Sequence, residues 1–583
     1  MKKTRILALL LALMMLAAML SGCGSKTEEP ASPAPEESAP AEESAPAEEA
    51  PAPEEPAPEE APEEAPAEPQ TAAEKVAPGW EYAPLSYPLD NPDGTVFSYW
   101  VIMDLSADSD LESLDQHPVI LKMTDYTGVG LDLIINSQYT GSEKTNLMYA
   151  SGEYPDFISN FSYSAGTEAA IEDEIIFDMK EMLPTYAPDY WKFLTEDSIY
   201  KSIATDAGAI ATFAGIGTPS RGPAEGLMVR QDWLDALGFA TPVTFEDFEE
   251  VLLAFKTEYA PADPLWLTLD GVLNNDLFCG SFGVKLKVDS MGSTRSGFYL
   301  EDGAVKFGYL EDGLKDYLEV MSKWYAEGII SPEFTTHITE MRDEGMIEAI
   351  LTGATGMFSR GDGLMDMFNK RGSAEGYNVV AIADPVVTEG DTIPFGYSTE
   401  MQTGGGIAMT TQCAYPELGM QWANYWYTDE GFVLGTYGIE GISFEFDENG
   451  DPQYTEMMTN DPSGRPLSSM KLDYTGFVQL RTDNSKPEAS YSQAAQDAPV
   501  IWASNRSGEG EIPTTATMTA EEGEEFTVIF SDITTYCAEN IVRFIIGDLP
   551  LSEVDAFQEQ IRSMNIDRCI ELWEQALERY NNR

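Results

Sequence analysis

From Thr95 onward the chain alternates short apolar runs with segments of helical periodicity, and this alternation limits the folds open to it. The runs 96–103, 131–135 and 156–158 have the length and apolar content of strands, while 118–126 and 141–149 fit helices. Strands alternating with helices at this spacing are typical of a parallel sheet with crossover helices. We therefore expect an α/β fold built on mainly parallel sheets.

Three later segments are predicted to be helical. Thr244 and Asp247 form a variant capping box before an apolar helical face, and a second helix covers 314–326, where Gly328 closes it. A helical tail covers 534–580 with a break at 547–550. We expect the apolar faces of these helices to be core, together with Trp233, Trp324 and Trp573.

The N-terminus has the pattern of an export signal. A basic start is followed by an apolar run from Ile6 to Leu20 that is short for a membrane span, and small residues come next. Residues 1–22 are therefore predicted to be a signal peptide. The sequence Leu20-Ser21-Gly22-Cys23 is similar to the bacterial lipobox, which implies lipidation of Cys23 and a location on the extracellular face of the cell membrane. The alternative is an ordinary secretory signal with a chance cysteine.

Residues 23–78 differ sharply from the rest. They are almost entirely Ala, Pro, Glu and Ser, which leaves little apolar surface to offset the entropy of ordering the chain. We predict an extended, solvated linker here. Residues 79–583 are rich in aromatic and aliphatic side chains, and this length favours two interleaved lobes over a single core.

Charge and cysteine content exclude some functions. The formal net charge of −67 disfavours nucleic acid and other polyanionic partners. Beyond Cys23, the spacing of the four cysteines matches no Cys-x-x-Cys metal or redox motif. Cys279, Cys413, Cys537 and Cys569 could form two disulfides or remain buried thiols.

The patterns typical of enzymes are missing from the sequence. It contains no Gly-x-Ser-x-Gly, His-Glu-x-x-His or Walker motif, and neither His117 nor His337 lies where a general base is expected. Gly404-Gly405-Gly406 lacks the Lys-Ser or Lys-Thr of a phosphate loop, so we expect a hinge or turn there. The acidic run 447–451 lacks the later Glu of a calcium loop. We predict no catalytic residue, cofactor or metal site.

Candidate ligand contacts are aromatic, amide and charged side chains near predicted strand ends, where ligands of open α/β sheets bind. Aromatic faces stack on sugar rings, and forked polar groups bind hydroxyls. For each aromatic residue the alternative is core packing, and for Arg360 with Asp362 it is a surface ion pair. The predicted ligand-binding residues are Asn160, Tyr163, Trp266, Arg360, Asp362, Tyr397, Glu400 and Trp502, the last in a stretch that we expect to be irregular.

Five blocks in order resemble family 1 extracellular solute-binding proteins of ABC importers, and more narrowly their LipO/YtcQ-like lipoprotein branch. They are 147–156 (LMYASGEYPD), 230–238 (RQDWLDALG), 324–330 (WYAEGII), 437–444 (YGIEGISF) and 544–552 (FIIGDLPLS). The resemblance implies a two-lobed fold like that of type II periplasmic binding proteins, with helix-flanked sheets, several hinge crossings and extra C-terminal helices. Gln231 and the 205–210 turn depart from the family pattern, and the acidic oxygens near that turn are too few for a calcium site.

The resemblance makes one function the leading hypothesis. A monomeric lipoprotein would capture a small solute, most often an oligosaccharide in this family, and deliver it to the transmembrane subunits of an ABC permease. The alternatives are a peptide or amino-acid receptor, a surface glycoside hydrolase, and a lipoprotein chaperone or adhesin. A hydrolase would release products from a sugar, whereas a receptor would bind the sugar unchanged.

Overall fold

The computed structural model describes residues 71–583 except for 104–108, 110, 138–139, 164–165, 270, 272–275, 287–296, 338–343, 373, 397–400, 449, 463–464, 466, 477, 486–490 and 509. Residues Pro69–Arg583 form one compact unit. The predicted signal peptide, Cys23 and nearly all of the predicted linker lie outside the described residues.

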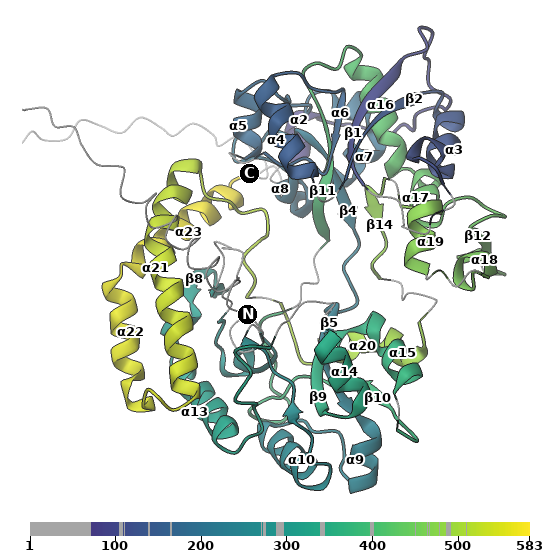
Figure 1. Cartoon of the computed structure of the whole chain (residues 1–583). Helices are drawn as coiled ribbons and strands as arrows, with labels where there is room; N and C mark the ends of the chain where they lie inside the picture. The colour runs from purple at the N-terminus through teal and green to yellow at the C-terminus, as the bar shows by residue number, and fades with distance from the viewer. Residues whose placement is uncertain are drawn as a thin grey trace, which may run out of the picture. The chain divides into compact units, whose positions relative to one another are not determined.

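A six-stranded sheet is the centre of the first lobe (Figure 1). Strand β11 is antiparallel to both of its neighbours, and every other pairing in the sheet is parallel, so the predicted mainly parallel sheet is confirmed. Its order is β14 (Arg481–Thr482), β4 (Thr212–Gly217), β11 (Gln402–Met409), β3 (Phe157–Ser159), β1 (Val96–Ile102) and β2 (Gly130–Asn136).

Helices cover this sheet because alternate strand residues must be buried. Phe97, Tyr99 and Val101 of β1 all lie in a core that the surrounding helices complete. The helices of this lobe are α3 (Pro118–Thr127), α4 (Gly141–Ser151), α5 (Thr167–Glu172), α6 (Leu183–Tyr186), α7 (Pro188–Leu194), α8 (Asp197–Ile203), α16 (Pro416–Asn424), α17 (Asp429–Tyr437), α18 (Glu456–Thr459) and α19 (Leu467–Tyr474). A hairpin of β12 (Phe444–Phe446) and β13 (Pro452–Tyr454) carries the acidic run 447–451 in its loop.

A four-stranded sheet is the centre of the second lobe. Strand β5 is antiparallel to both of its neighbours, while β6 and β9 are parallel to each other. Its order is β10 (Val379–Ala381), β5 (Glu225–Arg230), β9 (Thr355–Gly361) and β6 (Asp263–Leu265).

Both faces of the second sheet are buried, which explains the apolar runs in the middle of β5 and β9. Met357 of β9 lies in one core, and its neighbour Phe358 lies in the core on the opposite face. The covering helices are α9 (Gln231–Leu237), α10 (Phe245–Glu258), α12 (Asp276–Cys279), α13 (Gly313–Ala326), α14 (Glu344–Thr352), α15 (Asp362–Arg371) and α20 (Gln493–Ala503). A small hairpin, β7 (Phe298–Glu301) with β8 (Ala304–Phe307), extends the first of these cores.

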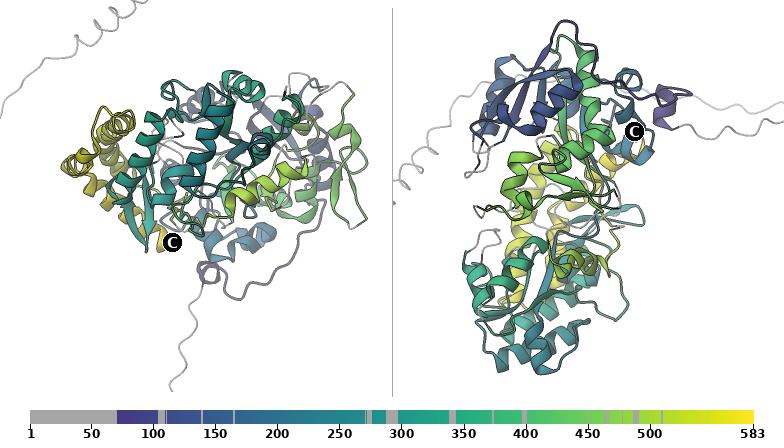
Figure 2. Two further views of the ribbon diagram at one scale, coloured as in Figure 1. Left: turned by 90° about the horizontal axis from the view of Figure 1, so that it is seen from below. Right: turned by 90° about the vertical axis from the view of Figure 1, so that its right-hand side faces the viewer.

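The C-terminal residues form the predicted extra helices, α21 (Ala520–Ile545), α22 (Val554–Ser563) and α23 (Ile566–Asn581). They pack against α13 and β8 and share their core (Figures 1 and 2). Trp233, Trp324 and Trp573 are all buried, so their prediction as core residues is confirmed.

Local signals set several helix ends as predicted. Thr244 and Asp247 make both bonds of a capping box at the start of α10. Gly238 and Gly328 adopt φ values of 78° and 66°, where a side chain would be strained, and they follow α9 and α13 as expected. The four cysteines beyond Cys23 are buried free thiols, so they do not form the two disulfides that the sequence also allowed.

Going by the described strands and helices, the chain passes between the two sheets three times: between β4 and β5, between β10 and β11, and between β14 and α20. Thr218 in the first crossing binds the third, because its hydroxyl donates to Asp483 at 3.1 Å and accepts from the Asn484 backbone N–H at 2.8 Å. The side-chain amide of Asn484 in turn donates to the Thr218 carbonyl at 3.0 Å. Several hinge crossings were expected. The first and third crossings are joined by these hydrogen bonds.

The crossings explain the one reversed strand in each sheet. Strand β5 is the first strand after the chain leaves β4, and β11 is the first strand after the return from β10. Each therefore starts at the sheet edge where the neighbouring strands end: Glu225 of β5 pairs with Gly361 of β9, and Gln402 of β11 pairs with Gly217 of β4. The carboxyl edges of the two sheets are thus joined by a short crossing, 218–224, so Gly217 and Glu225 are at most about 29 Å apart.

The packed part of the chain begins earlier than the predicted boundary after residue 78. Helix α2 (Ala72–Val76) has a complete capping box between Thr71 and Glu74. Ala73 is only 2% exposed within the first-lobe core, and the Trp80 indole N–H donates to the Pro184 carbonyl at 3.0 Å. Composition did not reveal this helix, because its stretch resembles the linker before it. A capping residue and one small buried side chain are enough to fix a single short helix.

Two deletions should distinguish the linker from the packed segment. Removing 30–70 leaves Thr71 and α2 in place, so we expect the melting temperature to stay within about 1 °C of the parent. Removing 30–78 also deletes α2 and its buried Ala73, so we expect a fall of a few degrees. Differential scanning calorimetry of the two proteins would measure this, and equal melting temperatures would show that α2 contributes nothing.

Candidate functional site

The end of β9 places two of the predicted residues at the carboxyl edge of the second sheet. Strand β9 ends at Gly361, and Asp362 starts α15, where a carboxylate is favoured by the helix dipole. The Asp362 carboxylate accepts the Gly363 backbone N–H at 2.7 Å. Arg360 and Asp362 therefore lie at a strand end as predicted.

Arg360 differs from the expected exposed residue. It is 6% exposed and pairs across the sheet with Gly226. It lies on the same face of β9 as the buried Phe358, two residues earlier. Arg360 is therefore not an exposed surface side chain. Because Arg360 is buried, replacing it would also cost stability, and loss of binding in such a variant would be ambiguous.

Trp502 is a core residue, and its predicted position in an irregular stretch is wrong. It lies in α20, is fully buried, and its indole N–H donates to the Leu227 carbonyl at 2.8 Å. A Cβ atom on Gly226 would come within 2.5 Å of its ring. Trp502 therefore fills the space against β5, and neither ring face is left for a ligand.

Trp266 follows β6 at the same sheet edge as Arg360. Strand β6 is parallel to β9, with Leu265 opposite Met357. The half-buried Trp266 ring stacks on His337, with centroids 4.1 Å apart and an angle of 11°. Its indole N–H is buried without a hydrogen-bond partner among the described residues. Trp266 is thus a half-buried ring held in place by His337 near this edge, with an enclosed indole N–H.

Asn160 and Tyr163 follow β3 at the carboxyl edge of the first sheet, as predicted. Asn160 is exposed and has φ 47°, a left-handed conformation that asparagine tolerates better than most residues. The Tyr163 hydroxyl donates to Asp173 at 2.6 Å, and this bond raises the pKa of the tyrosine above its usual value. The two residues lie near each other on one lobe.

The predicted residues thus form two groups. Asn160 and Tyr163 lie on the first sheet, and Trp266, Arg360 and Asp362 lie on the second, each group at a carboxyl edge. Tyr397 and Glu400 lie outside the described residues. Gly404, Gly405 and Gly406 are not a turn, since they form a bulge at the start of β11, beside Asn160.

Sequence reasoning missed some neighbours of these groups. Tyr149 of α4 packs at right angles to Tyr163 with centroids 5.2 Å apart, and Phe161 lies 6.3 Å from Tyr149. On the second lobe, the Tyr491 hydroxyl lies 2.6 Å from where a Cβ of Gly363 would be. Tyr149 belongs to the block 147–156, but its sequence pattern suggested only a helix.

Both histidines make contacts within the fold. His117 is buried, and burial lowers its pKa to about 4, so it is neutral near pH 7. His337 bonds the Leu267 carbonyl through Nδ1 at 3.0 Å and stacks on Trp266. Over the described ranges, no three His, Cys, Asp or Glu side chains gather in a way that could hold a metal ion.

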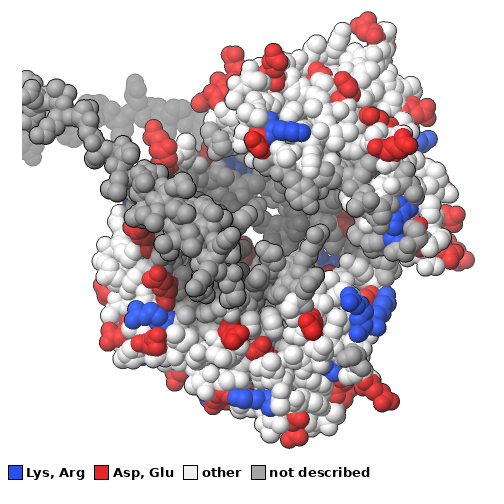
Figure 3. All heavy atoms as spheres, viewed as in Figure 1, with Lys and Arg blue, Asp and Glu red and all other residues white. Residues whose placement is uncertain are grey.

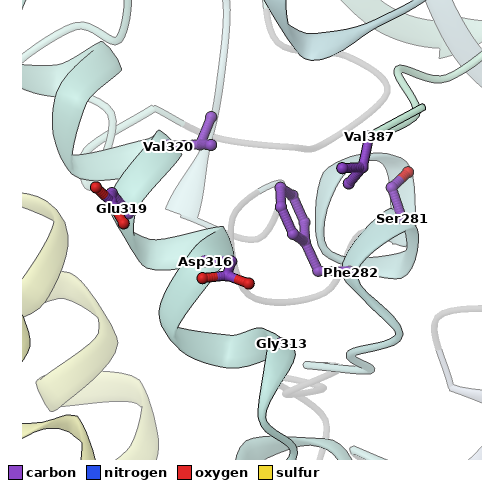
Figure 4. Close-up of a pocket in the computed structure, with 7 residues that line it drawn as sticks. All are labelled: Ser281, Phe282, Gly313, Asp316, Glu319, Val320 and Val387. Atoms are coloured by element: carbon purple, nitrogen blue, oxygen red, sulfur yellow. The ribbon is translucent and has the colours of Figure 1, made fainter. Parts of the chain in front are cut away.

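Acidic side chains are scattered over the face shown in Figure 3 among fewer basic ones, in keeping with the net charge. A cavity of about 470 Å³ lies in the second lobe between α13 and the turn at Phe282 (Figure 4). Its lining is Ser281, Phe282, Gly313, Asp316, Glu319, Val320 and Val387. It contains none of the predicted site residues. Of the helices described, none is long and apolar enough to cross a membrane.

Two helix-flanked sheets, joined by three crossings and each with a reversed entering strand, define the two-lobed α/β class of binding proteins. The fold agrees with a solved structure at a TM-score of 0.66 and 17% identity, covering 83% of this chain and 99% of the other. That structure is a solute-binding protein from Bifidobacterium longum infantis, described as HMO-binding and associated with an ABC transporter.

Residues 125–436 match the family model for bacterial extracellular solute-binding proteins, and the chain belongs to this family. Two Bacillus subtilis (strain 168) proteins are similar to it. Lipoprotein LipO is 24% identical over 38% of this chain and 42% of its own length. The polygalacturonan/rhamnogalacturonan-binding protein YtcQ is 23% identical over 60% of this chain and 67% of its own length. The chain thus spans less than half the length of LipO and about two thirds of YtcQ.

A substitution at Trp502 can show whether this residue stabilises the core or contacts a ligand. Trp502→Phe removes the bond to the Leu227 carbonyl and leaves a small void, so we expect a loss of about 1–3 kcal/mol in the free energy of unfolding. Affinity for a bound sugar should be unchanged, because the ring is enclosed. Urea unfolding and calorimetric titration would check both values. Weakened binding with unchanged stability would return Trp502 to the ligand site.

Proposed function

We propose that the carboxyl edges of the two sheets form one groove that binds an oligosaccharide, which the protein delivers to an ABC permease. The observation that carries the proposal is topological. Crossing 218–224 joins the end of β4 to the start of β5, so Gly217 at the edge of the first sheet and Glu225 at the edge of the second are at most about 29 Å apart.

The chemistry on these edges suits a sugar. Trp266 and Tyr163 offer aromatic surfaces for the C–H face of a pyranose, and Asn160 and Asp362 offer groups that bond hydroxyls. The names of YtcQ and of the Bifidobacterium protein support a carbohydrate ligand. Closure would follow from ligand contact with both lobes, since a ligand shifts an open–closed balance by its differential affinity.

The same proposal places the protein outside the cell as a monomeric lipoprotein. The export signal, the Leu20-Ser21-Gly22-Cys23 sequence and the similarity to lipoprotein LipO support a lipid on Cys23. The linker would then hold the two lobes away from the membrane. No nucleic-acid partner and no catalytic role are proposed, because the surface is acidic and both histidines are engaged in packing.

Binding should be tested with a panel of neutral tetrasaccharides and trigalacturonate. We expect at least one sugar to raise the melting temperature and to be recovered intact by chromatography after long incubation. A stabilising dipeptide or tripeptide would favour the peptide receptor instead. Release of shorter sugars at a rate proportional to protein concentration would favour a glycoside hydrolase.

Asn160→Gly should weaken binding without harming the fold. Glycine accepts the φ of 47°, so only the amide is lost, and we expect about tenfold weaker binding of the best sugar. The matched control is Asp302→Gly, an exposed residue with φ 50° in the β7–β8 hairpin. Titration calorimetry should separate the two variants, and equal affinities would remove Asn160 from the site.

Cys23→Ala should abolish anchoring. The variant is expected in the medium or as uncleaved precursor, and it should not incorporate labelled lipid, since the thiol is the proposed attachment point. Fractionation of cells that express the parent and the variant would measure this. Lipid incorporation into the variant would exclude Cys23 as the attachment site.

A further inference from the structure

Three aromatic side chains form a wall on one face of the first sheet, beside β3 and β11. Tyr149 comes from α4, and Phe161 and Tyr163 come from the segment after β3. The Tyr149 ring lies 6.3 Å from Phe161 and 5.2 Å from Tyr163, both at steep angles. All three side chains are half-buried, and they pack against a small core of their own that includes Ala170 and Ile176.

The hydroxyl groups of the wall are held in place. Tyr149 donates to the Ser162 carbonyl at 3.0 Å, and Tyr163 donates to Asp173 at 2.6 Å. These bonds fix the ring orientations in advance, so little side-chain freedom remains to be lost when a ligand stacks on them. A rigid, partly exposed aromatic surface suits a ligand with a flat C–H face.

Next to the wall the backbone of β11 is uncovered. Asn160 lies against Gly405, where a Cβ would be 3.4 Å from the Asn160 amide oxygen, and the Phe161 N–H donates to the Gly406 carbonyl at 3.3 Å. Gly404 is exposed, its φ is ordinary, and a Cβ there would meet no described atom within 4 Å. Glycine costs stability in a strand, so neither packing nor φ explains its presence at 404.

The charge beside the wall is negative. Asp173, which holds Tyr163, lies between Glu172 and Glu174, and all three are exposed. A uronate or sulfated sugar stacked on Tyr163 would place its charge near these carboxylates, which is unfavourable. A neutral ring would meet no such repulsion, and its hydroxyls could donate to Asp173.

We infer that Tyr149, Phe161, Tyr163, Asn160 and the uncovered backbone at Gly404 form a subsite for one neutral pyranose ring of the oligosaccharide. The inference rests on the proposed function and names the residues and the sugar charge that the first lobe selects. The ring stacks on the tyrosines, the Asn160 amide binds a hydroxyl, and the missing side chain at Gly404 lets the sugar approach the strand.

The test uses the full-length protein and the neutral tetrasaccharide that the parent binds most tightly. Tyr163→Ala should weaken binding about tenfold or more, while Tyr163→Phe should stay within about threefold, because it keeps the ring and loses only the bond to Asp173. Gly404→Ala should also weaken binding about tenfold, since a methyl group would occupy the approach.

A matched control and a second ligand make the outcomes distinct. Gly523→Ala in α21 also meets no described atom within 4 Å, and it should leave affinity unchanged. Melting temperatures of the Gly404 and Tyr163 variants should stay close to that of the parent. Asp173→Asn should improve binding of trigalacturonate relative to the neutral sugar.

Each contrary result has one meaning. If the parent binds no sugar, the proposed function fails. If the parent binds while Gly404→Ala and Tyr163→Ala bind equally well, the function stands and this subsite is wrong. If the Tyr163 variant loses stability and keeps affinity, the wall is only packing. Tighter binding of trigalacturonate than of every neutral sugar would overturn the charge assignment.

Discussion

The separate burial of the two sheets is the constraint on which the rest of the structure depends. Phe97 and Tyr99 are enclosed within one lobe, while Met357 and Phe358 are enclosed on opposite faces of the other sheet. Because each lobe completes its own core, the segments between them need carry little apolar packing. The bonds among Thr218, Asp483 and Asn484 are polar and near the surface, so they can hold two crossings together without fixing the lobes rigidly.

The C-terminal helices add a second polar connection between the lobes. They share a core with the second lobe, yet Arg579 of α23 binds Asp206, which follows α8 of the first lobe, at 2.9 Å. Arg579 also holds Glu522 of α21, and both carboxylates are mostly shielded from water. The 205–210 turn, for which calcium was considered and not predicted, thus has its acidic side chain bound by arginine.

Topology also explains why the site lies at strand ends. A strand that enters from the other lobe must start at the edge where the crossing arrives, so β5 and β11 run against their neighbours. The residues that follow the strand ends at that edge include Asn160 after β3, Trp266 after β6 and Asp362 at the start of α15. Arg360 lies in β9, whose sheet is covered on both faces, and Trp502 lies on the side of α20 that packs against β5, so both are less accessible than their surroundings in sequence suggested.

The sequence by itself determined the local elements and the class of fold. The Thr244–Asp247 capping box, the stop at Gly238 and the alternating runs of β1 to β3 each depend on contacts within a few residues. Only the tertiary structure decided which side chains face solvent. The Trp502 ring packs against the backbone of Gly226, and Tyr149 of α4 packs against Tyr163 from the segment after β3. Ala73 is buried in the first-lobe core, which composition did not predict. Such contacts join residues distant in the chain, and no local pattern records which partner will arrive.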